Sequence, residues 1–212
     1  MLNYQLTKGS YIYPTPAGAY YAVTNKQKDA ARNFLITLMS CNQSPELTEE
    51  TLCELSGMAL EDTLILLERL QSSGLVQAIN EPIDVIQLSL EDALPSLLQR
   101  LSGSEKALLA DENGFYLSSY GFHHESSEEL AGLAAELSKL QERYVGLLTG
   151  NLNYQSCAIG VINAAGHSDI GFWPMHVGQQ HFILVLSGTP QLNKNSLVEL
   201  VWLLINRYGT EK

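Results

Sequence analysis

The sequence predicts an α+β protein of two modules, one over residues 1–90 and one over residues 91–212. Short apolar runs typical of strands alternate with segments of helical spacing, and the pattern changes near Ser89–Asp92, where a ribbon-like stretch gives way to leucines at helical spacing. The chain has 212 residues, of which 45% are hydrophobic and 17% charged. Because single domains commonly contain ~100–150 residues, this length and composition predict two folded units.

The first module begins with aromatic, β-prone runs. Tyr11–Pro14 and Ala19–Val23 are separated by proline and glycine, which predicts a β-hairpin. Thr24 and Gln27 then match a capping box, and the apolar positions behind them predict a helix that ends near Cys41.

Two further helices and a ribbon follow in this module. Thr48 has the features of an N-cap, and Gly57 those of a helix end. Leucines at helical spacing predict a third helix over residues 60–72, and residues 75–79 and 83–88 are interpreted as two short strands. This order of helices and ribbon is that of a winged helix-turn-helix domain.

The second module is predicted to contain a helix, a β-hairpin, a long helix, three strands and a closing helix. Pro95 is expected in the first turn of the first of these helices, and Asn113-Gly114 between two apolar runs indicates the hairpin. Capping boxes indicate where the long helix and the closing helix start, at Ser126 with Glu129 and at Ser196 with Glu199. The three strands are expected at residues 155–162, 169–176 and 181–186.

One side of the predicted long helix is rich in alanine and leucine. Small side chains let a neighbouring helix approach closely, so this side favours contact with another helix over contact with a sheet. Its members are Leu130, Ala131, Leu133, Ala134, Leu137 and Leu140.

Two stretches of the second module resemble a known family. They are Ala107–Asp111 with Gly114 in the hairpin, and Glu128–Ala135 at the start of the long helix. With the element order of residues 93–212, they resemble the Roadblock (dynein light chain) family. The resemblance implies a five-stranded antiparallel sheet with flanking helices, a homodimer built by the long helix and the third strand, and a role as regulator or platform for Ras-like small GTPases. The dimer residues that it implies are Ala131, Ala134, Ala135, Leu137, Cys157, Ala158, Ile159 and Val161.

The sequence contains no recognisable catalytic motif. It lacks the G-x-x-x-x-G-K-[ST] phosphate loop, the G-x-S-x-G elbow and the H-E-x-x-H zinc helix. Its three cysteines are an odd number without C-x-x-C spacing, which suggests neither a disulfide framework nor a zinc site. We therefore expect no enzymatic activity, no cofactor and no metal, and any GTPase must be a separate protein.

Two groups in the last strands have alternative interpretations. His176 and His181 are either metal ligands with acidic support or polar residues at strand ends, and the turn between them at Gly178 favours the second. Phe172, Trp173 and Met175 belong either to the core or to a partner contact. An enzymatic site around Trp173, His176 and His181 is the weakest of the functional hypotheses.

The charge of the chain disfavours anionic partners. With 12 Lys and Arg against 23 Asp and Glu, the formal net charge is −11, and a chain with this charge repels nucleic acid and anionic lipid. The third helix of the first module, which would be the recognition helix of a DNA-binding domain, carries Glu61, Asp62 and Glu68 with a single Arg69.

No membrane segment or secretory signal is expected. The chain has no apolar run of the ~20 residues needed to cross a bilayer, and Met1–Gln5 lacks the basic and then apolar order of a secretory signal, so a cytoplasmic location is expected. The main interpretation is a non-catalytic, homodimeric regulator or scaffold of a small GTPase. The alternative is a DNA-binding transcriptional regulator whose second module dimerises.

Overall fold

The computed structural model describes residues 6, 9–27, 29–154 and 157–209. Its main sheet is formed by β3 (Ala107–Asp111), β4 (Tyr116–Tyr120), β5 (Ile159–Ile162), β6 (Ser168–Val177) and β7 (Gln180–Ser187). The strand order is β4-β3-β7-β6-β5, and each neighbouring pair is antiparallel. The predicted five-stranded antiparallel sheet is confirmed.

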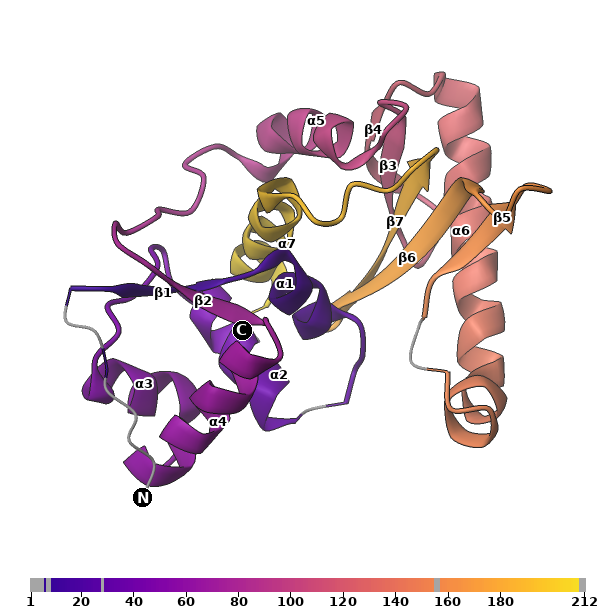
Figure 1. Cartoon of the computed structure of the whole chain (residues 1–212). Helices are drawn as coiled ribbons and strands as arrows, with labels where there is room; N and C mark the ends of the chain where they lie inside the picture. The colour runs from indigo at the N-terminus through magenta and orange to yellow at the C-terminus, as the bar shows by residue number, and fades with distance from the viewer. Residues whose placement is uncertain (1–5, 7–8, 28, 155–156, 210–212) are drawn as a thin grey trace.

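Helices cover both faces of this sheet (Figure 1). Helix α6 (His124–Val145) lies on one face, and α5 (Leu90–Leu101) and α7 (Asn195–Tyr208) lie on the other. Alternation along β7 explains the two layers, because Ile183 and Val185 are buried under α6 while Leu184 and Leu186 belong to the core beneath α5 and α7.

The N-terminal part combines a ribbon with four helices. The ribbon pairs β1 (Tyr11–Pro14) with β2 (Val76–Ile79) in antiparallel register. The helices are α1 (Pro16–Val23), α2 (Ala30–Ser40), α3 (Glu49–Ser56) and α4 (Leu60–Ser72). The helices predicted from Thr48 to Gly57 and over residues 60–72 are confirmed, since Thr48 caps α3 and Gly57 ends it in the left-handed conformation, with φ of +66°.

The predicted hairpin of Tyr11–Pro14 with Ala19–Val23 is wrong, because Ala19–Val23 belongs to helix α1. The side chain of Thr15 accepts a hydrogen bond from the backbone N–H of Gly18 and Pro16 occupies the first turn, which together start a helix. The strand β1 finds its partner far along the chain in β2, and no local signal specifies that pairing.

Two other predictions for the N-terminal part are wrong. The N-cap of α2 is Asp29, whose side chain accepts from the N–H of Arg32, whereas Thr24 follows the end of α1. Residues 83–88 do not form a strand beside β2, and residues 83–85 pair with the segment after α2: Ser44 exchanges hydrogen bonds with Ile83, and the N–H of Val85 donates to the carbonyl of Asn42.

Helix starts in the second part differ from the predicted capping boxes. Ser89 caps α5, so Pro95 lies inside this helix and not in its first turn. Helices α6 and α7 begin before Ser126 and Ser196, and neither has a side-chain N-cap hydrogen bond. Of the strand predicted at residues 155–162, the structure has β5 over Ile159–Ile162. Residues 155–156 lie outside the described residues.

The hairpin between β3 and β4 is confirmed. At its turn, one oxygen of the Asp111 carboxylate accepts from the backbone N–H groups of Asn113 and Phe115, at 2.9 Å each. Gly114 has a φ of +88°, a backbone conformation that residues with a Cβ atom rarely adopt. The local pattern of aspartate, asparagine and glycine therefore fixes this turn.

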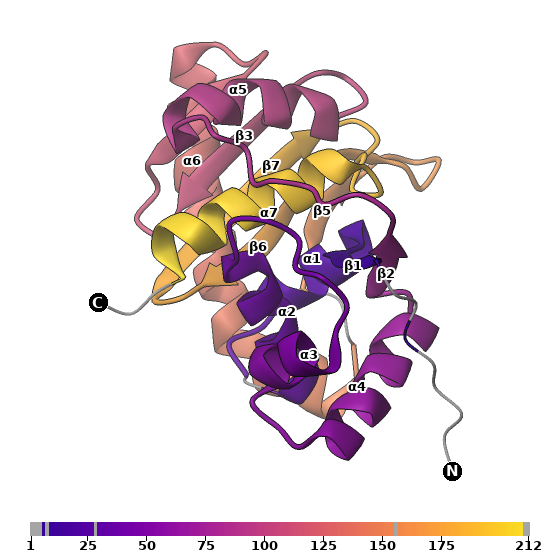
Figure 2. The same ribbon diagram turned by 90° about the vertical axis from the view of Figure 1, so that its left-hand side faces the viewer.

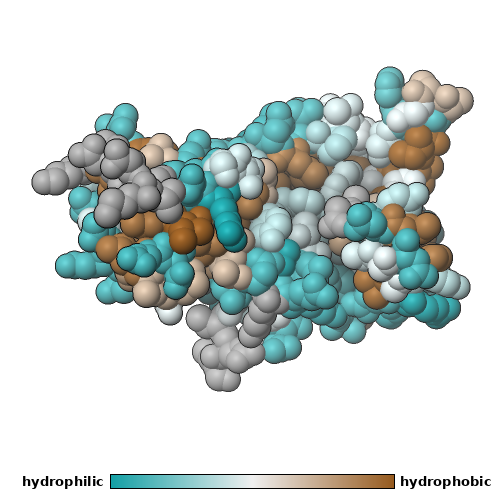
Figure 3. Space-filling model, turned by 60° about the horizontal axis from the view of Figure 1, so that its bottom comes forward, coloured by the Kyte–Doolittle hydropathy of each residue, from teal (hydrophilic) through white to brown (hydrophobic). Residues whose placement is uncertain are grey.

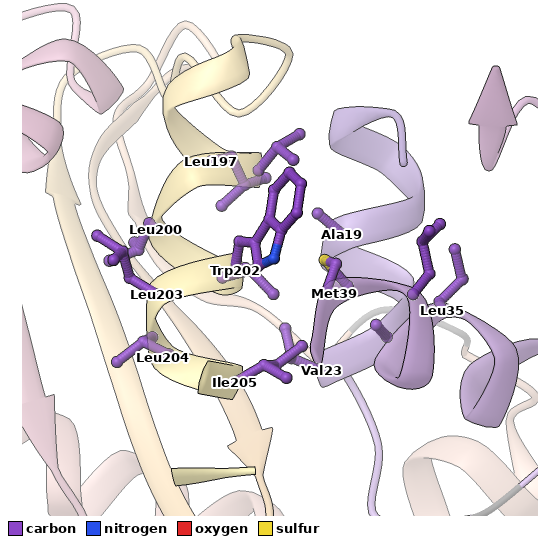
Figure 4. Close-up of a cluster of buried hydrophobic side chains, with 14 of the residues drawn as sticks. Ala19, Val23, Leu35, Met39, Leu197, Leu200, Trp202, Leu203, Leu204 and Ile205 are labelled. Atoms are coloured by element: carbon purple, nitrogen blue, oxygen red, sulfur yellow. The ribbon is translucent and has the colours of Figure 1, made fainter. Parts of the chain in front are cut away.

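Helix α7 joins the N-terminal part to the main sheet (Figure 2). Its Trp202 side chain lies between α7 and the helices α1 and α2, close to Ala19 and Met39 (Figure 4). The indole Nε1 donates to the carbonyl of Cys41 at 2.8 Å, and Nδ2 of Asn206 donates to the carbonyl of Met39 at 2.9 Å. One buried apolar cluster therefore extends through both parts of the molecule.

In the described part of the chain, none of the helices is both long and apolar enough to cross a membrane.

Candidate functional site

The alanines of α6 contact the sheet of their own chain. Ala131 and Ala134 are fully buried against a cluster that includes Leu108 and Ile183. Ala135 is also buried, and Leu137 packs at the border of the same cluster. The expectation that this side of the helix favours another helix over a sheet is therefore wrong. Small side chains here let α6 lie close to the strands.

The opposite side of α6 exposes large apolar side chains. Leu133 and Leu140 are 42% and 46% exposed, and the stripe continues through Tyr144 to Leu147 in η1 (Gly146–Asn151), a π-helical turn that follows α6. Together with the half-buried Leu137, these residues are spaced alternately four and three apart. This is the spacing of the seam along which two helices pack in a coiled coil.

Strand β5 is an edge strand beside α6. Within the described part of the chain, β6 is its one partner strand, and the side chains of Val161 and Ile162 are 55% and 59% exposed. Ile159 is half-buried and lines a small hollow together with Ala134 and Leu137, and Nε2 of Gln141 in α6 donates a hydrogen bond to the carbonyl of Cys157, directly before β5. We call the exposed apolar residues of this region the α6–β5 surface: Leu133, Leu140, Tyr144, Leu147, Val161 and Ile162.

Figure 3 shows apolar residues at the right-hand end of the molecule, over the region of η1 and β5. An unpaired strand edge next to exposed apolar side chains is a surface that pairs readily with another chain. Sequence reasoning missed the leucine seam because it assigned Leu133 and Leu140 to the same side as the alanines. The alternating spacing of four and three was the signal that distinguishes them.

The aromatic cluster of β6 is mostly core. Phe172 is buried under α6, and Met175 is buried on the opposite face of the sheet, so neither offers surface to a partner. Trp173 is half-buried against the larger core, and its ring lies over Gly171. The role of partner contact therefore does not hold for Phe172 and Met175.

The structure brings His176 and His181 together at the end of the β6–β7 hairpin. They are directly opposite in the register, and their rings stack with centroids 4.1 Å apart and planes 25° apart. A metal ion lies in the plane of each imidazole that binds it, so nearly parallel rings do not direct their nitrogens at one ion. The described residues also contain no group of three or more His, Cys, Asp or Glu suited to a metal.

Charged and polar groups surround this histidine pair. Nδ1 of His181 lies 3.8 Å from the Glu142 carboxylate, and its Nε2 lies 3.4 Å from Oγ of Ser138. Nζ of Lys26, in the loop between α1 and α2, pairs with Glu142 at 2.9 Å and lowers the pKa of that carboxyl. This ion pair joins the N-terminal part to α6, and the sequence alone has no signal for it.

Both imidazoles are neutral at neutral pH. Burial, with smaller contributions from the neighbouring His181 and Lys26, lowers the pKa of His176 from 6.5 to about 4. Burial also lowers the pKa of His181, although Glu142 opposes that change. Neutral, stacked imidazoles are suited to hydrogen bonding and do not provide a positive charge.

The exposed side of α4 is acidic. Glu61, Asp62 and Glu68 are exposed there, with Arg69 as the accompanying base. Because contacts to DNA phosphates and base edges are made mainly by Arg, Lys, Asn and Gln, this side is poorly suited to the role of a recognition helix.

No family model matches this chain, and no curated protein matches it. Two solved structures are similar to it. A Roadblock/LC7 domain from Streptomyces avermitilis is 19% identical, with 55% of this chain and 92% of that chain covered and a TM-score of 0.37. MglB from Myxococcus xanthus is 14% identical, with 57% and 91% covered and a TM-score of 0.36. At these identities and TM-scores, the two similarities by themselves establish no function for this chain.

Proposed function

We propose that this protein is a non-catalytic, homodimeric interaction protein that regulates or scaffolds a Ras-like small GTPase in the bacterial cytoplasm. The observation that carries the dimer is the α6–β5 surface, where an apolar helix seam lies beside an unpaired strand edge. The proposal that the partner is a GTPase rests on the resemblance of residues 107–114 and 128–135 to the Roadblock family. The N-terminal part is proposed as a further module, over residues 1–90, that docks protein and not DNA.

In the proposed dimer, β5 pairs with β5 of a second copy and α6 packs against its equivalent. Ile159 and Val161 lie on this strand, with Cys157 and Ala158 directly before it. The seam residues Leu133 and Leu140 provide the direct helix contacts, because the buried Ala131, Ala134 and Ala135 have little or no exposed surface. Pairing would provide hydrogen-bond partners for the backbone N–H and C=O groups at the edge of β5 and would cover the exposed apolar side chains.

The proposed partner supplies the nucleotide site, since this sequence has no phosphate-binding loop. The chain then acts through contacts alone, by holding the GTPase in one conformation or by bringing it to another protein.

Affinity capture from a lysate of the source cell tests the GTPase proposal. The immobilised protein is expected to retain a Ras-like GTPase, identified by mass spectrometry, and the rate of GTP hydrolysis or the nucleotide affinity of that GTPase is expected to change when the purified protein is added. Capture of a specific DNA fragment with no GTPase would favour the transcriptional regulator and contradict the proposal.

Two variants make this capture experiment specific. Leu140→Glu places a charge on the α6–β5 surface and is expected to lose the dimer and the retained GTPase if binding needs the dimer. Phe115→Glu, at the turn between β3 and β4, is the matched control, because it introduces the same charge at an exposed apolar residue outside this surface and outside the N-terminal module. Equal loss of the GTPase by both variants would indicate nonspecific capture.

A further inference from the structure

The second half of helix α6 has less support from the sheet than the first half. The buried residues of this helix end at Ser138, and residues 139–145 are exposed apart from the half-buried Gln141. Figure 1 shows this part of the helix extending past the strands toward η1. Because it buries little apolar surface, its position depends on other contacts.

A cavity of about 200 Å³ lies between this second half and the rest of the protein. Residues 24–26 of the loop between α1 and α2 line it together with the histidine pair, and residues of α6 between 138 and 145 form the opposite wall. A cavity provides few packing contacts, so the polar contacts that cross this space hold the helix in place.

Glu142 is where these contacts meet. Its Oε1 lies 2.9 Å from Nζ of Lys26 and 3.8 Å from Nδ1 of His181. The neighbouring Gln141 donates from Nε2 to the carbonyl of Cys157. Of these contacts, the Lys26–Glu142 ion pair joins α6 to the N-terminal part, whereas the others join it to the second part of the chain.

The ion pair lies on the side of α6 opposite the exposed seam. Glu142 is two residues from both Leu140 and Tyr144, and at about 100° per residue it lies about 160° around the helix from each. Leu140 and Tyr144 are 46% and 47% exposed. The contacts at Glu142 therefore hold the helix from behind and leave the seam free for a second copy.

We propose that the Lys26–Glu142 ion pair is a strap by which the N-terminal part holds the second half of α6 and raises the affinity of the α6–β5 surface for a second copy. This inference rests on the proposed dimer. A helix that is already held in place loses less conformational entropy when its partner binds. The coupling is reciprocal, so a partner of the N-terminal part that breaks the ion pair weakens the dimer.

Reversal of the charge at residue 26 tests the strap in the full-length protein. Lys26→Glu replaces attraction to Glu142 by repulsion, and the double variant Lys26→Glu/Glu142→Lys restores an ion pair with the charges exchanged. Because exposed ion pairs have small energies, Lys26→Glu is expected to raise the dissociation constant of the dimer about twofold to fivefold, as measured by sedimentation equilibrium. The double variant is expected to restore the value of the wild type.

Arg100→Glu is the matched control. It makes the same charge change in another exposed ion pair, Arg100–Glu199, which joins α5 to α7 with the two atoms 3.0 Å apart. This variant is expected to leave the dissociation constant unchanged. Circular dichroism establishes that each variant is folded.

Hydrogen exchange provides a measurement that does not need the dimer. In a monomer made by Val161→Asp, Lys26→Glu is expected to accelerate amide exchange in residues 139–145, and the double variant is expected to slow it again. Unchanged exchange, no rescue by the double variant, or faster exchange with an unchanged dissociation constant would overturn the strap and leave the dimer standing. A wild type that never dimerises would refute the proposed function together with this effect on its affinity.

Discussion

His176 illustrates how burial determines the chemistry of a single residue. Its ring stacks on His181 between the sheet and α6, and the cost of burying a charge there lowers its pKa to about 4. In the unfolded chain the same imidazole has an ordinary pKa near 6.5. The unfolded state therefore binds more protons than the folded state between these two values.

We expect the free energy of unfolding to fall as the pH is lowered from 6.5 toward 4. A histidine with a lowered folded pKa stabilises the fold fully above its unfolded pKa and loses this contribution as the pH falls. At about pH 5, the contribution lost by His176 is at most about 2 kcal/mol. Urea denaturation at about pH 7.5 and pH 5 measures the difference.

His176→Phe is the variant for this measurement, because it keeps an aromatic ring and cannot be protonated. Its stability is expected to depend less steeply on pH than that of the wild type. His167→Phe is the matched control, since it makes the same substitution at an exposed histidine outside the stacked pair. An identical pH profile for the wild type and His176→Phe would refute this account of the histidine pair.

At the scale of elements, the sequence predicts those whose signals are local. Thr48 and Gly57 define α3, because they are the residues that cap its two ends. Asp111, Asn113 and Gly114 define the β3–β4 hairpin, because the hydrogen bonds of this turn form within the turn itself. The five-stranded sheet was predicted differently, because it was implied by the resemblance to the Roadblock family and not by these local signals.

Elements specified by distant contacts were mispredicted. The segment of Ala19–Val23 is β-prone, but Thr15 and Pro16 start a helix there, and its small Gly18 lets that helix lie directly against Leu75. Likewise, Ile83 and Val85 form hydrogen bonds with the segment after α2 and not with β2. The start of α1 therefore has a local signal that the prediction overlooked, whereas the partners of β1 and of residues 83–85 are determined by tertiary contacts.

At the candidate site, the two sides of α6 also could not be told apart from the sequence. Alanines and leucines both recur at helical spacing, so periodicity alone did not distinguish the side that contacts the sheet from the side that is exposed. The structure assigns Ala134 to the sheet and Leu133 to the solvent. The histidine pair and Lys26 also come together only through tertiary contacts, although His176 and His181 were recognised as a pair in the sequence.

We expect Ala134→Leu to destabilise the protein by about 1–3 kcal/mol, because its side chain would overpack the contact between α6 and the sheet. Lys139→Ala, at an exposed position of the same helix outside the α6–β5 surface, is expected to change the stability by less than about 0.5 kcal/mol. Thermal and urea denaturation measure both. If Ala134→Leu were as stable as the wild type, α6 would not lie against the sheet as described.

The whole molecule depends on α7, which packs between the main sheet and the N-terminal helices. Trp202 fills this contact and donates a hydrogen bond to the C-terminal end of α2. The core is continuous across the proposed module boundary at residues 90–91, so the two parts are expected to unfold together.

We expect Trp202→Ala to lower the free energy of unfolding by about 3–5 kcal/mol, because it leaves a large cavity between the two parts. Trp202→Phe keeps most of the apolar volume and loses the hydrogen bond, so a smaller loss is expected. Calorimetry measures both and shows whether the wild type unfolds in one transition. Two well-separated transitions in the wild type would contradict the shared core.

The central claim is that two copies associate through the α6–β5 surface. Light scattering coupled to size-exclusion chromatography tests it most directly, on the wild type, Val161→Asp and Ile65→Asp. The wild type and Ile65→Asp are expected at twice the 23.4 kDa chain mass, and Val161→Asp, which places a charge on the β5 edge, is expected as a folded monomer. A monomeric wild type, or a Val161→Asp variant that remains a dimer, would contradict the claim.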